Sequence, residues 1–224
     1  MSDLYHALEN KEVFRRFPPE VLKDLAAYAV RRNLDSGEFL CHQGEFWPAA
    51  VYVHSGQLRW SMVSSGGKEH QLFRIESGEI FWAHSFFDDQ EMPASLSALK
   101  DTAVFVWSRE TLLPLLKRYP EAMWELTGLL TRIMREAREI IYGLAFQPVA
   151  GRLAAYLLDS LHDPDQQTMN REMTLDEMAS SLATSPEVVC RLLYQFQSDQ
   201  IIEITRTTIT FQDRRALEEL VERT

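Results

Sequence analysis

The sequence predicts an α+β protein in which a β-roll, one long helix and a winged helix-turn-helix follow one another along 224 residues. Three patterns lead to this prediction. Short β-branched and aromatic runs separated by glycine occupy residues 39–108, which is typical of a small barrel or jelly roll. An apolar seam runs through residues 126–144 at alternating spacings of four and three. Two short amphipathic helices and a β-hairpin then occupy residues 174–211.

These patterns divide the chain into three parts. We expect a β-roll domain in residues 1–119, a long dimerisation helix and hinge in 120–146, and a winged helix-turn-helix domain in 147–224. A length of 224 residues suits two domains of ordinary size. A hydrophobic content of 46% and an aromatic content of 11% are those of a folded globular protein.

The N-terminal part begins with short helices and continues as strands. Apolar residues between Val13 and Ala29 recur at helical spacing, so we expect helices over 3–33, with Pro18-Pro19 starting the second. Strands are then predicted at residues 51–53, 58–63, 72–75, 80–81 and 104–107. Gly37, Gly44, Gly56, Gly66-Gly67 and Gly78 fall between the strands, where turns need glycine.

A helix is expected from Arg109, and a longer one from Pro120 to about Leu144. The longer helix carries a heptad seam, called the predicted seam below: Leu126, Leu130, Ile133, Ala137, Ile140 and Leu144. A heptad repeat over nearly three turns of the pattern favours a parallel homodimer. The alternative is that the same face of the helix packs on its own β-roll.

Residues 174–196 read as a helix-turn-helix. Thr174 precedes an apolar run with Glu177 three residues later, which predicts a capping box. Ser185 is predicted to cap the second helix, with Pro186 at its first position. Helical spacing turns Val188, Val189, Leu192, Leu193 and Phe196 inward and leaves Pro186, Glu187, Cys190, Arg191 and Gln195 outward.

Alternating apolar residues around Arg206-Thr207-Thr208 predict a β-hairpin after the second helix. A helix-turn-helix followed by such a hairpin is a winged helix, whose second helix enters a DNA major groove. A helix over 150–161, a turn-rich loop over 162–173 and a final helix over 214–222 complete the expected domain.

The negative net charge disfavours nucleic-acid binding and limits the affinity that such binding can have. The chain has a formal net charge of −10, and residues 145–224 hold seven arginines and no lysine against thirteen acidic residues. DNA-binding proteins usually present a basic surface, because phosphate neutralisation supplies much of the affinity. Arg191 and Arg206 lie where the reading helix and the wing tip would approach DNA. We therefore expect weak, strongly salt-dependent binding that improves in an activated state.

The compartment is expected to be the cytoplasm. The N-terminus lacks a basic-then-apolar signal peptide, and no apolar run approaches the length of a membrane span. The two cysteines, Cys41 and Cys190, fall in different predicted domains, which agrees with a reducing compartment.

Three stretches resemble one family. They are the glycine-rich roll (Gly44-Glu45, Gly56, Gly78-Glu79-Ile80-Phe81), the hinge LAFQPVAGRLAAYLL at 144–158, and SPEVVCR at 185–191. Together they resemble, over almost the full length, the Crp/Fnr family of bacterial transcription regulators. The resemblance implies a cyclic-nucleotide-binding-like jelly roll, a homodimer, a palindromic double-stranded DNA operator and RNA polymerase as partner, with no enzymatic activity.

The resemblance also assigns residues that contact DNA. Glu187 and Arg191 are implied to read base edges, with Pro186 and Cys190 at positions that vary with the operator. Arginine makes two hydrogen bonds to guanine and glutamate accepts one from cytosine, each contributing about 1–3 kcal/mol of discrimination. The complete expected set is Thr174, Ser185, Pro186, Glu187, Cys190, Arg191 and Arg206.

The effector positions depart from the family pattern. Members that bind cyclic AMP use a Gly-Glu pair for the ribose and an Arg-Ser pair for the phosphate. The corresponding positions here hold Trp82-Ala83 and Pro93-Ala94, and the purine-binding Thr-Ser pair corresponds to Ala137-Arg138. Cyclic AMP is therefore not expected to bind in the usual manner. An iron-sulfur cluster is not expected either, because clusters take four cysteines and the chain has two.

The residues at these positions predict an apolar, aromatic pocket instead. Its predicted lining is Phe81, Trp82, Ala83, Phe86, Met92, Pro93, Ala94 and Ser95, and it is expected to face Ala137 and Arg138 of the long helix. In the alternative interpretation these bulky residues fill the nucleotide space, and the regulator has no small ligand.

The sequence also allows other signals for the β-roll and other classes of protein. His42, His54, His70 and His84, with the Cys41-His42 pair, allow a haem or metal sensor of the same family. Oxidation of Cys41 or Cys190 is a further possible signal. The acidic C-terminal part permits a ligand-binding module that has lost DNA binding. A cupin-like enzyme is the weakest alternative, because no His-x-His or Ser-His-Asp pattern stands out.

Overall fold

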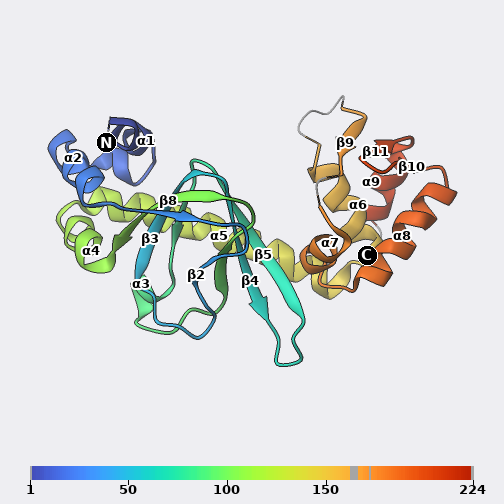
Figure 1. Ribbon diagram of the computed structural model, residues 1–224, viewed down its shortest axis with the longest axis horizontal. Coiled ribbons are helices and arrows are strands. Elements are labelled where there is room, and N and C mark those ends of the chain that lie inside the picture. Colours follow the sequence, from blue (N-terminus) through green and yellow to red (C-terminus); the bar gives the residue numbers. More distant parts are fainter. Residues whose placement is uncertain (1, 162–165, 172, 223–224) are drawn as a thin grey trace. The chain divides into compact units, whose positions relative to one another are not determined.

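The computed structural model describes residues 2–161, 166–171 and 173–222, and the chain divides into two compact units (Figure 1). The first unit comprises residues 1–66 and 72–136, and the second comprises 67–71 and 137–224. Among the described helices, none combines the length and apolarity needed to cross a membrane.

The first unit is built on two four-stranded antiparallel sheets. One sheet has the order β1-β8-β3-β6 and the other β2-β7-β4-β5. The strands of the first are β1 Val30–Leu34, β8 Thr102–Ser108, β3 Ala49–Ser55 and β6 Ile80–Trp82. Those of the second are β2 Phe39–Cys41, β7 Ser95–Ala98, β4 Gln57–Val63 and β5 Glu69–Glu76. This is the predicted β-roll.

Apolar side chains from both sheets form one hydrophobic core. Val51, Val53 and Val104 come from the first sheet, and Leu58 and Leu96 from the second; all five are fully buried. Each strand therefore turns alternate residues inward, as the pleat of a strand requires.

The turn between β3 and β4 shows why glycine is needed in the roll. Gly56 has a φ of 92°, a conformation that residues with a side chain rarely adopt. A Cβ atom at this position would also lie 2.6 Å from the carbonyl oxygen of Asp101. The close approach of β8 thus excludes any other residue at position 56.

Helices cover the outer face of the first sheet. They are α1 Ser2–Glu9, the 3-10 helix η1 Phe14–Arg16, α2 Pro19–Tyr28, α3 Ser85–Asp88, α4 Arg109–Arg118 and residues 120–136 of the long helix α5 Pro120–Phe146. Phe14 stacks on Trp82 with ring centroids 6.1 Å apart, and the indole N–H of Trp107 donates to the carbonyl oxygen of Leu25 at 2.8 Å. These contacts build a second hydrophobic core on this face of the roll.

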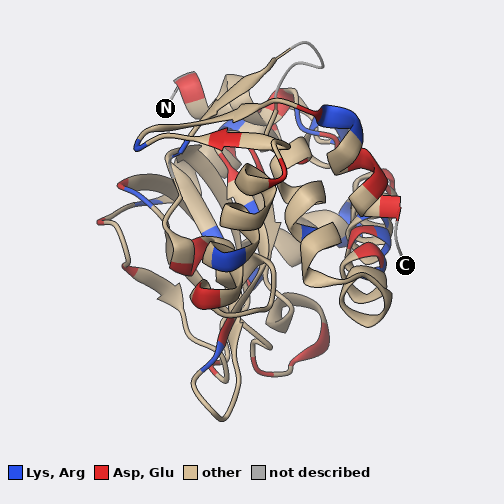
Figure 2. Cartoon of the chain, turned by 90° about the vertical axis from the view of Figure 1, so that its right-hand side faces the viewer, with Lys and Arg blue, Asp and Glu red and all other residues tan. Residues whose placement is uncertain are grey.

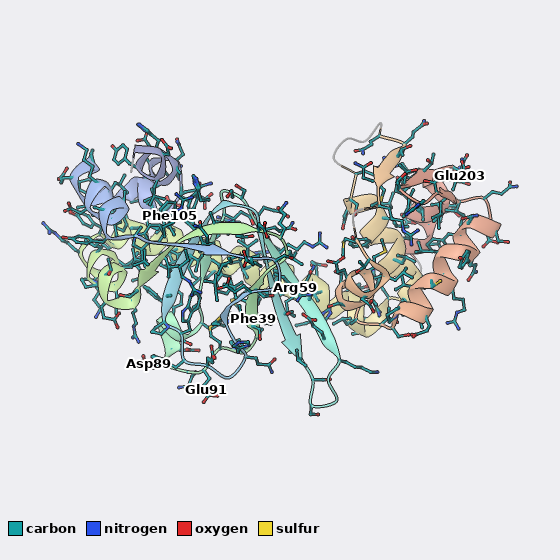
Figure 3. The ribbon with its side chains drawn as sticks, in the orientation of Figure 1. Phe39, Arg59, Asp89, Glu91, Phe105 and Glu203 are labelled. Atoms are coloured by element: carbon teal, nitrogen blue, oxygen red, sulfur yellow. The ribbon has the colours of Figure 1, made fainter. Side chains whose placement is uncertain are left out.

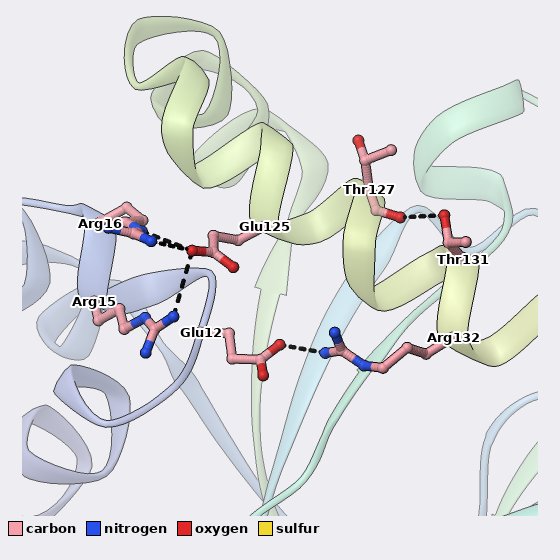
Figure 4. A network of polar contacts seen from close by, with 7 residues as sticks. All are labelled: Glu12, Arg15, Arg16, Glu125, Thr127, Thr131 and Arg132. Atoms are coloured by element: carbon pink, nitrogen blue, oxygen red, sulfur yellow. Dashed lines mark hydrogen bonds and ion pairs between the residues drawn. The ribbon is translucent and has the colours of Figure 1, made fainter.

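Ion pairs attach the N-terminal helices to α5 (Figure 4). The Nε of Arg16 donates to the Glu125 carboxylate at 2.8 Å, and Arg15 lies 3.4 Å from the same oxygen. Glu12 pairs with Arg132, which lies about two turns after Glu125 on α5. All of these groups are partly exposed, so each pair contributes little stability, but together they define where the N-terminal segment contacts the helix.

The second unit contains the helix-turn-helix. Its helices are α6 Val149–Asp159, α7 Leu175–Ser181, α8 Pro186–Ser198 and α9 Arg214–Glu222. Three strands, β10 Ile202–Ile204, β11 Thr208–Phe211 and β9 Thr168–Asn170, form a sheet in the order β10-β11-β9. The core of this unit includes Leu153, Leu157, Met178, Val189 and Leu217, all fully buried.

The predicted fold class is confirmed, while some elements differ from the prediction. The helical spacing before Ala29 does not extend to residue 33: Val30–Leu34 form strand β1, because pairing with β8 outweighs local propensity. Strand β9 lies in the region predicted as a loop, where residues 162–165 and 172 fall outside the described chain. Its partner, β11, lies some forty residues later, so no local pattern indicated it.

Candidate nucleic-acid interface and effector cavity

Helix α7 begins with the predicted capping box. The Thr174 hydroxyl accepts a hydrogen bond from the Glu177 N–H at 3.2 Å, and the Glu177 carboxylate accepts one from the Thr174 N–H at 2.7 Å. Two N–H groups that the helix itself leaves unpaired are thereby satisfied. Thr174, predicted to contact DNA, has its side chain engaged in this cap.

The turn between α7 and α8 is short and strained. Leu182 caps the C-terminal end of α7, and Ala183 follows with a φ of 50°, in the left-handed region. Ser185 occupies the N-cap position of α8, but its side chain makes no capping bond, which corrects the prediction. Its hydroxyl instead hydrogen-bonds to Glu187 and lowers the pKa of that carboxyl, so Glu187 is an anion at neutral pH.

Helix α8 separates into a buried and an exposed face. Val189, Leu192, Leu193 and Phe196 are buried, while Glu187, Arg191 and Gln195 are exposed and Pro186 and Cys190 are half-buried. The prediction missed one member of the exposed face: Tyr194, with 68% of its surface exposed, three residues after Arg191. Its helical spacing from Arg191 was the signal that could have identified it.

The second exposed arginine lies at the tip of the wing. Arg206 occupies the turn between β10 and β11, where the Thr205 hydroxyl accepts from the N–H groups of Thr207 and Thr208 at 3.3 and 3.0 Å. This turn holds Arg206 exposed at its tip.

Arg191 and Arg206 differ from the arginines of α9 in their ion pairing. Arg214 and Arg215 form ion pairs with Glu218 and Glu219 along α9. By contrast, Arg191 and Arg206 have no ion-pair partner among the described residues. Figure 2 marks the basic and acidic residues of the chain. Helix α8 and the wing thus each present one arginine that lacks an ion-pair partner within the described part of the chain.

A third arginine, Arg152 on α6, forms hydrogen bonds to the end of the first helix of the helix-turn-helix. The Arg152 guanidinium donates to the carbonyl oxygen of Leu182 at 3.0 Å and to that of Gln147 at 2.8 Å. Partial burial lowers the pKa of Arg152 below its ordinary value, although arginine stays protonated. The side chain thus joins the C-terminal end of α7 to the segment between α5 and α6.

The first unit contains a cavity of about 550 Å³ between the β-roll and α5. Of the predicted pocket residues, Phe81 and Trp82 line it. Ala83, Ala94 and Ser95 are buried elsewhere in the roll, and Pro93 is exposed.

The residues of α5 that line the cavity differ from those that were predicted. Ala137 and Arg138 are not among the lining residues; Arg138 is exposed and pairs with Glu139. The prediction missed Trp60, Phe73, His84, Leu130 and Ile133. The inward alternation of Leu58 and Trp60 was readable in the sequence, but the packing of α5 against the roll was not.

Three of the four candidate histidines, His42, His54 and His84, pack against aromatic rings. His70 instead forms a hydrogen bond with a backbone carbonyl oxygen. His42 stacks on Phe39 with centroids 4.3 Å apart, and His54 meets Phe105 edge-on at 5.5 Å. Figure 3 labels the two phenylalanines. His84 stacks on Trp60 at 5.0 Å. Within the described ranges no three His, Cys, Asp or Glu residues are grouped so as to hold a metal ion.

The two cysteines have different environments. Cys41 is buried in the roll, and desolvation raises the pKa of its thiol to about 12. Cys190 is half-buried on α8. Since the thiolate is the reactive form, Cys41 is not placed to act as a redox sensor.

The predicted seam of α5 faces the chain's own roll over its first half. Leu126 is fully buried in the core of the first unit, and Leu130 and Ile133 line the cavity. Leu126 is therefore unavailable to a second chain, and for this residue the alternative interpretation holds. A heptad pattern shows that one face of the helix is apolar, but it does not show whether the roll or another chain covers that face.

A different face of α5 is exposed, and we call it the exposed stripe. It comprises Trp124, Thr127, Thr131, Met134, Arg138 and Ile141. Its spacings alternate three and four, and Trp124, Met134 and Ile141 are 77%, 73% and 66% exposed. The Thr127 and Thr131 hydroxyls donate to carbonyl oxygens one turn earlier, at 2.9 and 2.8 Å, and Figure 4 shows the second of these bonds.

A winged helix-turn-helix and a β-roll with a long helix define a DNA-binding transcription regulator. Residues 151–220 match the family described as the Crp-like helix-turn-helix domain, and residues 31–119 match the cyclic nucleotide-binding domain. The cyclic AMP receptor protein of Thermus thermophilus is 30% identical over 220 residues, covering 98% of this chain and 96% of that protein. The chain belongs to the Crp/Fnr family of transcription regulators.

Solved structures show the same fold. A Crp/Fnr regulator from Eubacterium rectale has a TM-score of 0.76 at 21% identity, covering 94% of this chain and 98% of that one. A variant of CooA from Carboxydothermus hydrogenoformans also has a TM-score of 0.76 at 21% identity, with coverage of 98% and 95%.

Proposed function

We propose that this protein is a homodimeric, sequence-specific transcription regulator that reads a palindromic operator through α8. The observation that carries the proposal is Arg191: an exposed guanidinium without an ion-pair partner among the described residues, on the second helix of a helix-turn-helix. Glu187, one turn earlier, is ionised and exposed. The pair suits guanine and cytosine edges in a major groove. The wing adds Arg206, a contact for the phosphate backbone.

We infer that the dimer forms through the exposed stripe. A second copy of the same helix is the partner that fits it, because alternating spacings of three and four match a helix with the same repeat. From Trp124 to Ile141 the stripe extends about 26 Å along α5. Two chains would present two reading helices to half-sites about one DNA turn apart.

The proposed signal acts at the β-roll. Events there shift α5 and the hinge, and the reading helices move between two arrangements of different DNA affinity. Cyclic AMP in the family's usual manner is not the proposed signal, since Trp82-Ala83 and Pro93-Ala94 offer neither a carboxylate for a ribose nor a cation for a phosphate. RNA polymerase is the proposed protein partner, on the strength of family membership.

Selection of bound duplexes from a random DNA pool tests the assignment. The full-length protein is expected to enrich a palindrome with half-sites about one DNA turn apart. Arg191→Ala should lower operator affinity at least tenfold and leave non-specific affinity almost unchanged. Arg215→Ala, an exposed arginine of α9, is the matched control and should enrich the same palindrome. Retained operator selectivity in Arg191→Ala contradicts the assignment.

A further inference from the structure

The cavity between the β-roll and α5 has a lining that indicates what it binds. Its volume of about 550 Å³ falls in the range of small-molecule sites, about 300–1,000 Å³. Every lining residue belongs to the first unit. The inference rests on the proposed function only in treating this cavity as the place where the signal is received.

The wall contributed by the roll is aromatic. The Trp60 ring lies parallel to Phe73, at 10° and 5.8 Å between centroids, and close to parallel to His84, at 23° and 5.0 Å. Phe81 is tilted against Trp60 at 5.8 Å. Such offset and tilted arrangements are those that aromatic rings prefer, so another flat ring can extend the group.

The wall contributed by α5 is mostly aliphatic. Its apolar lining residues are Leu129, Leu130, Ile133 and Met134. A molecule in the cavity would bury apolar surface against both the roll and α5, and burial of apolar surface is the main source of affinity in such sites. Occupancy therefore acts directly on the position of α5 against the roll.

The charged groups of the lining cancel. They are Lys11, Arg74 and Arg132 against Glu12, Glu79 and Glu136. Arg132 pairs with Glu12, and the Glu79 carboxylate accepts the N–H of Glu76 at 2.8 Å. A cyclic phosphodiester would meet no net positive charge in this lining. The lining therefore favours an uncharged ligand.

His84 offers a polar group that can orient such a ligand, beside the indole N–H groups of Trp60 and Trp82, which have no hydrogen-bond partner among the described residues. Partial burial lowers the pKa of His84, and the nearby Asp88 opposes this shift, so the imidazole is neutral at pH 7. A neutral imidazole offers one N–H donor and one lone pair. It lies against the Trp60 ring, at the aromatic wall.

We propose that this cavity binds an uncharged, planar aromatic molecule of one or two fused rings, held beside Trp60 and hydrogen-bonded through one polar substituent to His84. Binding of this ligand is the signal that shifts α5 against the roll.

Calorimetric titration of the full-length protein at pH 7 tests the proposal with three probes. They are 2-naphthol, a neutral fused ring with one hydroxyl; 2-naphthoate, the same ring carrying an anion; and cyclic AMP. 2-Naphthol is expected to bind, and 2-naphthoate and cyclic AMP at least tenfold more weakly. Trp60→Ala removes the stacking ring, and Ile133→Trp fills the cavity from the opposite wall. Each should weaken 2-naphthol binding at least tenfold.

Tyr28→Ala, at an exposed aromatic residue of α2 outside the cavity lining, is the matched control and should leave 2-naphthol binding unchanged. If Trp60→Ala fails to fold, as judged by thermal unfolding, the result for Ile133→Trp decides. The proposal is overturned if 2-naphthol does not bind, if Ile133→Trp binds it as well as the original protein, or if either anion binds as tightly. Because these titrations contain no DNA, a negative result leaves operator binding intact, and failed operator selection leaves the cavity result standing.

Discussion

The guanidinium of Arg152, on α6, donates two hydrogen bonds to the carbonyl oxygen of Leu182, at 3.0 Å from Nη2 and 3.3 Å from Nε. Leu182 is the C-cap of the first helix of the helix-turn-helix. The carbonyls at the end of a helix lack partners within it, so a cation there satisfies an acceptor and complements the helix dipole. Arg152 therefore fixes the turn from which α8 departs.

Arg152→Met should lower the free energy of unfolding of the second unit by about 2 kcal/mol, because it removes charged hydrogen bonds to partly buried carbonyls. Operator affinity should fall with it, since the orientation of α8 depends on this turn. Hydrogen exchange of the α7 amides measures the first effect and fluorescence anisotropy the second. Arg215→Met is the control, and its effect should stay within about 0.5 kcal/mol. An Arg152→Met protein with unchanged exchange in α7 would refute the role given to Arg152.

Ala183→Gly should raise the thermal stability of the second unit. Ala183 has a φ of 50°, and a residue with a side chain in this left-handed conformation costs roughly 1–2 kcal/mol. Glycine removes this cost, but it also raises the conformational entropy of the unfolded chain, which offsets part of the gain. We expect a net gain of about 0.5–1 kcal/mol by calorimetry. Ala155→Gly, inside α6, is the opposite case and should cost about 1 kcal/mol. Equal losses in both variants would show that the turn carries no strain.

Arg206→Ala should weaken DNA binding by similar factors for operator and non-operator sequences. A wing-tip arginine contacts the phosphate backbone, so its loss should reduce the slope of log affinity against log salt by about 1. Anisotropy titrations at several salt concentrations measure this slope. Thr207→Ala, next to Arg206 in the same turn, leaves the charge in place and should keep the slope. Loss of selectivity in Arg206→Ala would instead indicate that the wing reads bases.

Met134→Glu should dissociate the proposed dimer. The substitution places two carboxylates opposite each other in the centre of the exposed stripe, where burial of a charge is costly. Analytical ultracentrifugation should show a monomer, and operator affinity should fall because the half-sites are no longer bound together. Tyr28→Glu adds the same charge at an exposed aromatic residue of α2 and should leave the dimer intact. A dimeric Met134→Glu protein would exclude the exposed stripe as the interface.

Cys190 should react with iodoacetamide at neutral pH while Cys41 stays unmodified in the folded protein. Burial raises the pKa of Cys41 from 9.0 to about 12, so its thiolate is scarce below that pH. Because an unfolded chain ionises this thiol from about pH 9, the contribution of Cys41 to stability is present below pH 9 and is lost as the pH rises towards 12. Mass spectrometry of labelled peptides measures both sites. Rapid labelling of Cys41 at pH 7 would contradict its burial.

The sequence by itself determined the order of the domains and the local structure of the DNA-reading part. The capping box of Thr174 and Glu177, Pro186 at the start of α8 and the inward face of α8 all follow from interactions within a few residues. Such interactions are readable because residues three or four positions apart are neighbours on a helix.

The tertiary structure decided which surfaces pack against which. The heptad spacing of α5 fitted a dimer, yet Leu126 packs into the roll and the exposed apolar residues lie on the stripe of Trp124, Met134 and Ile141. The wall of the cavity likewise combines Trp60, from the roll, with Ile133, from a helix over seventy residues later. An apolar pattern shows that a face is covered but not by what, because burial is non-directional and its partner is chosen by contacts distant in the sequence.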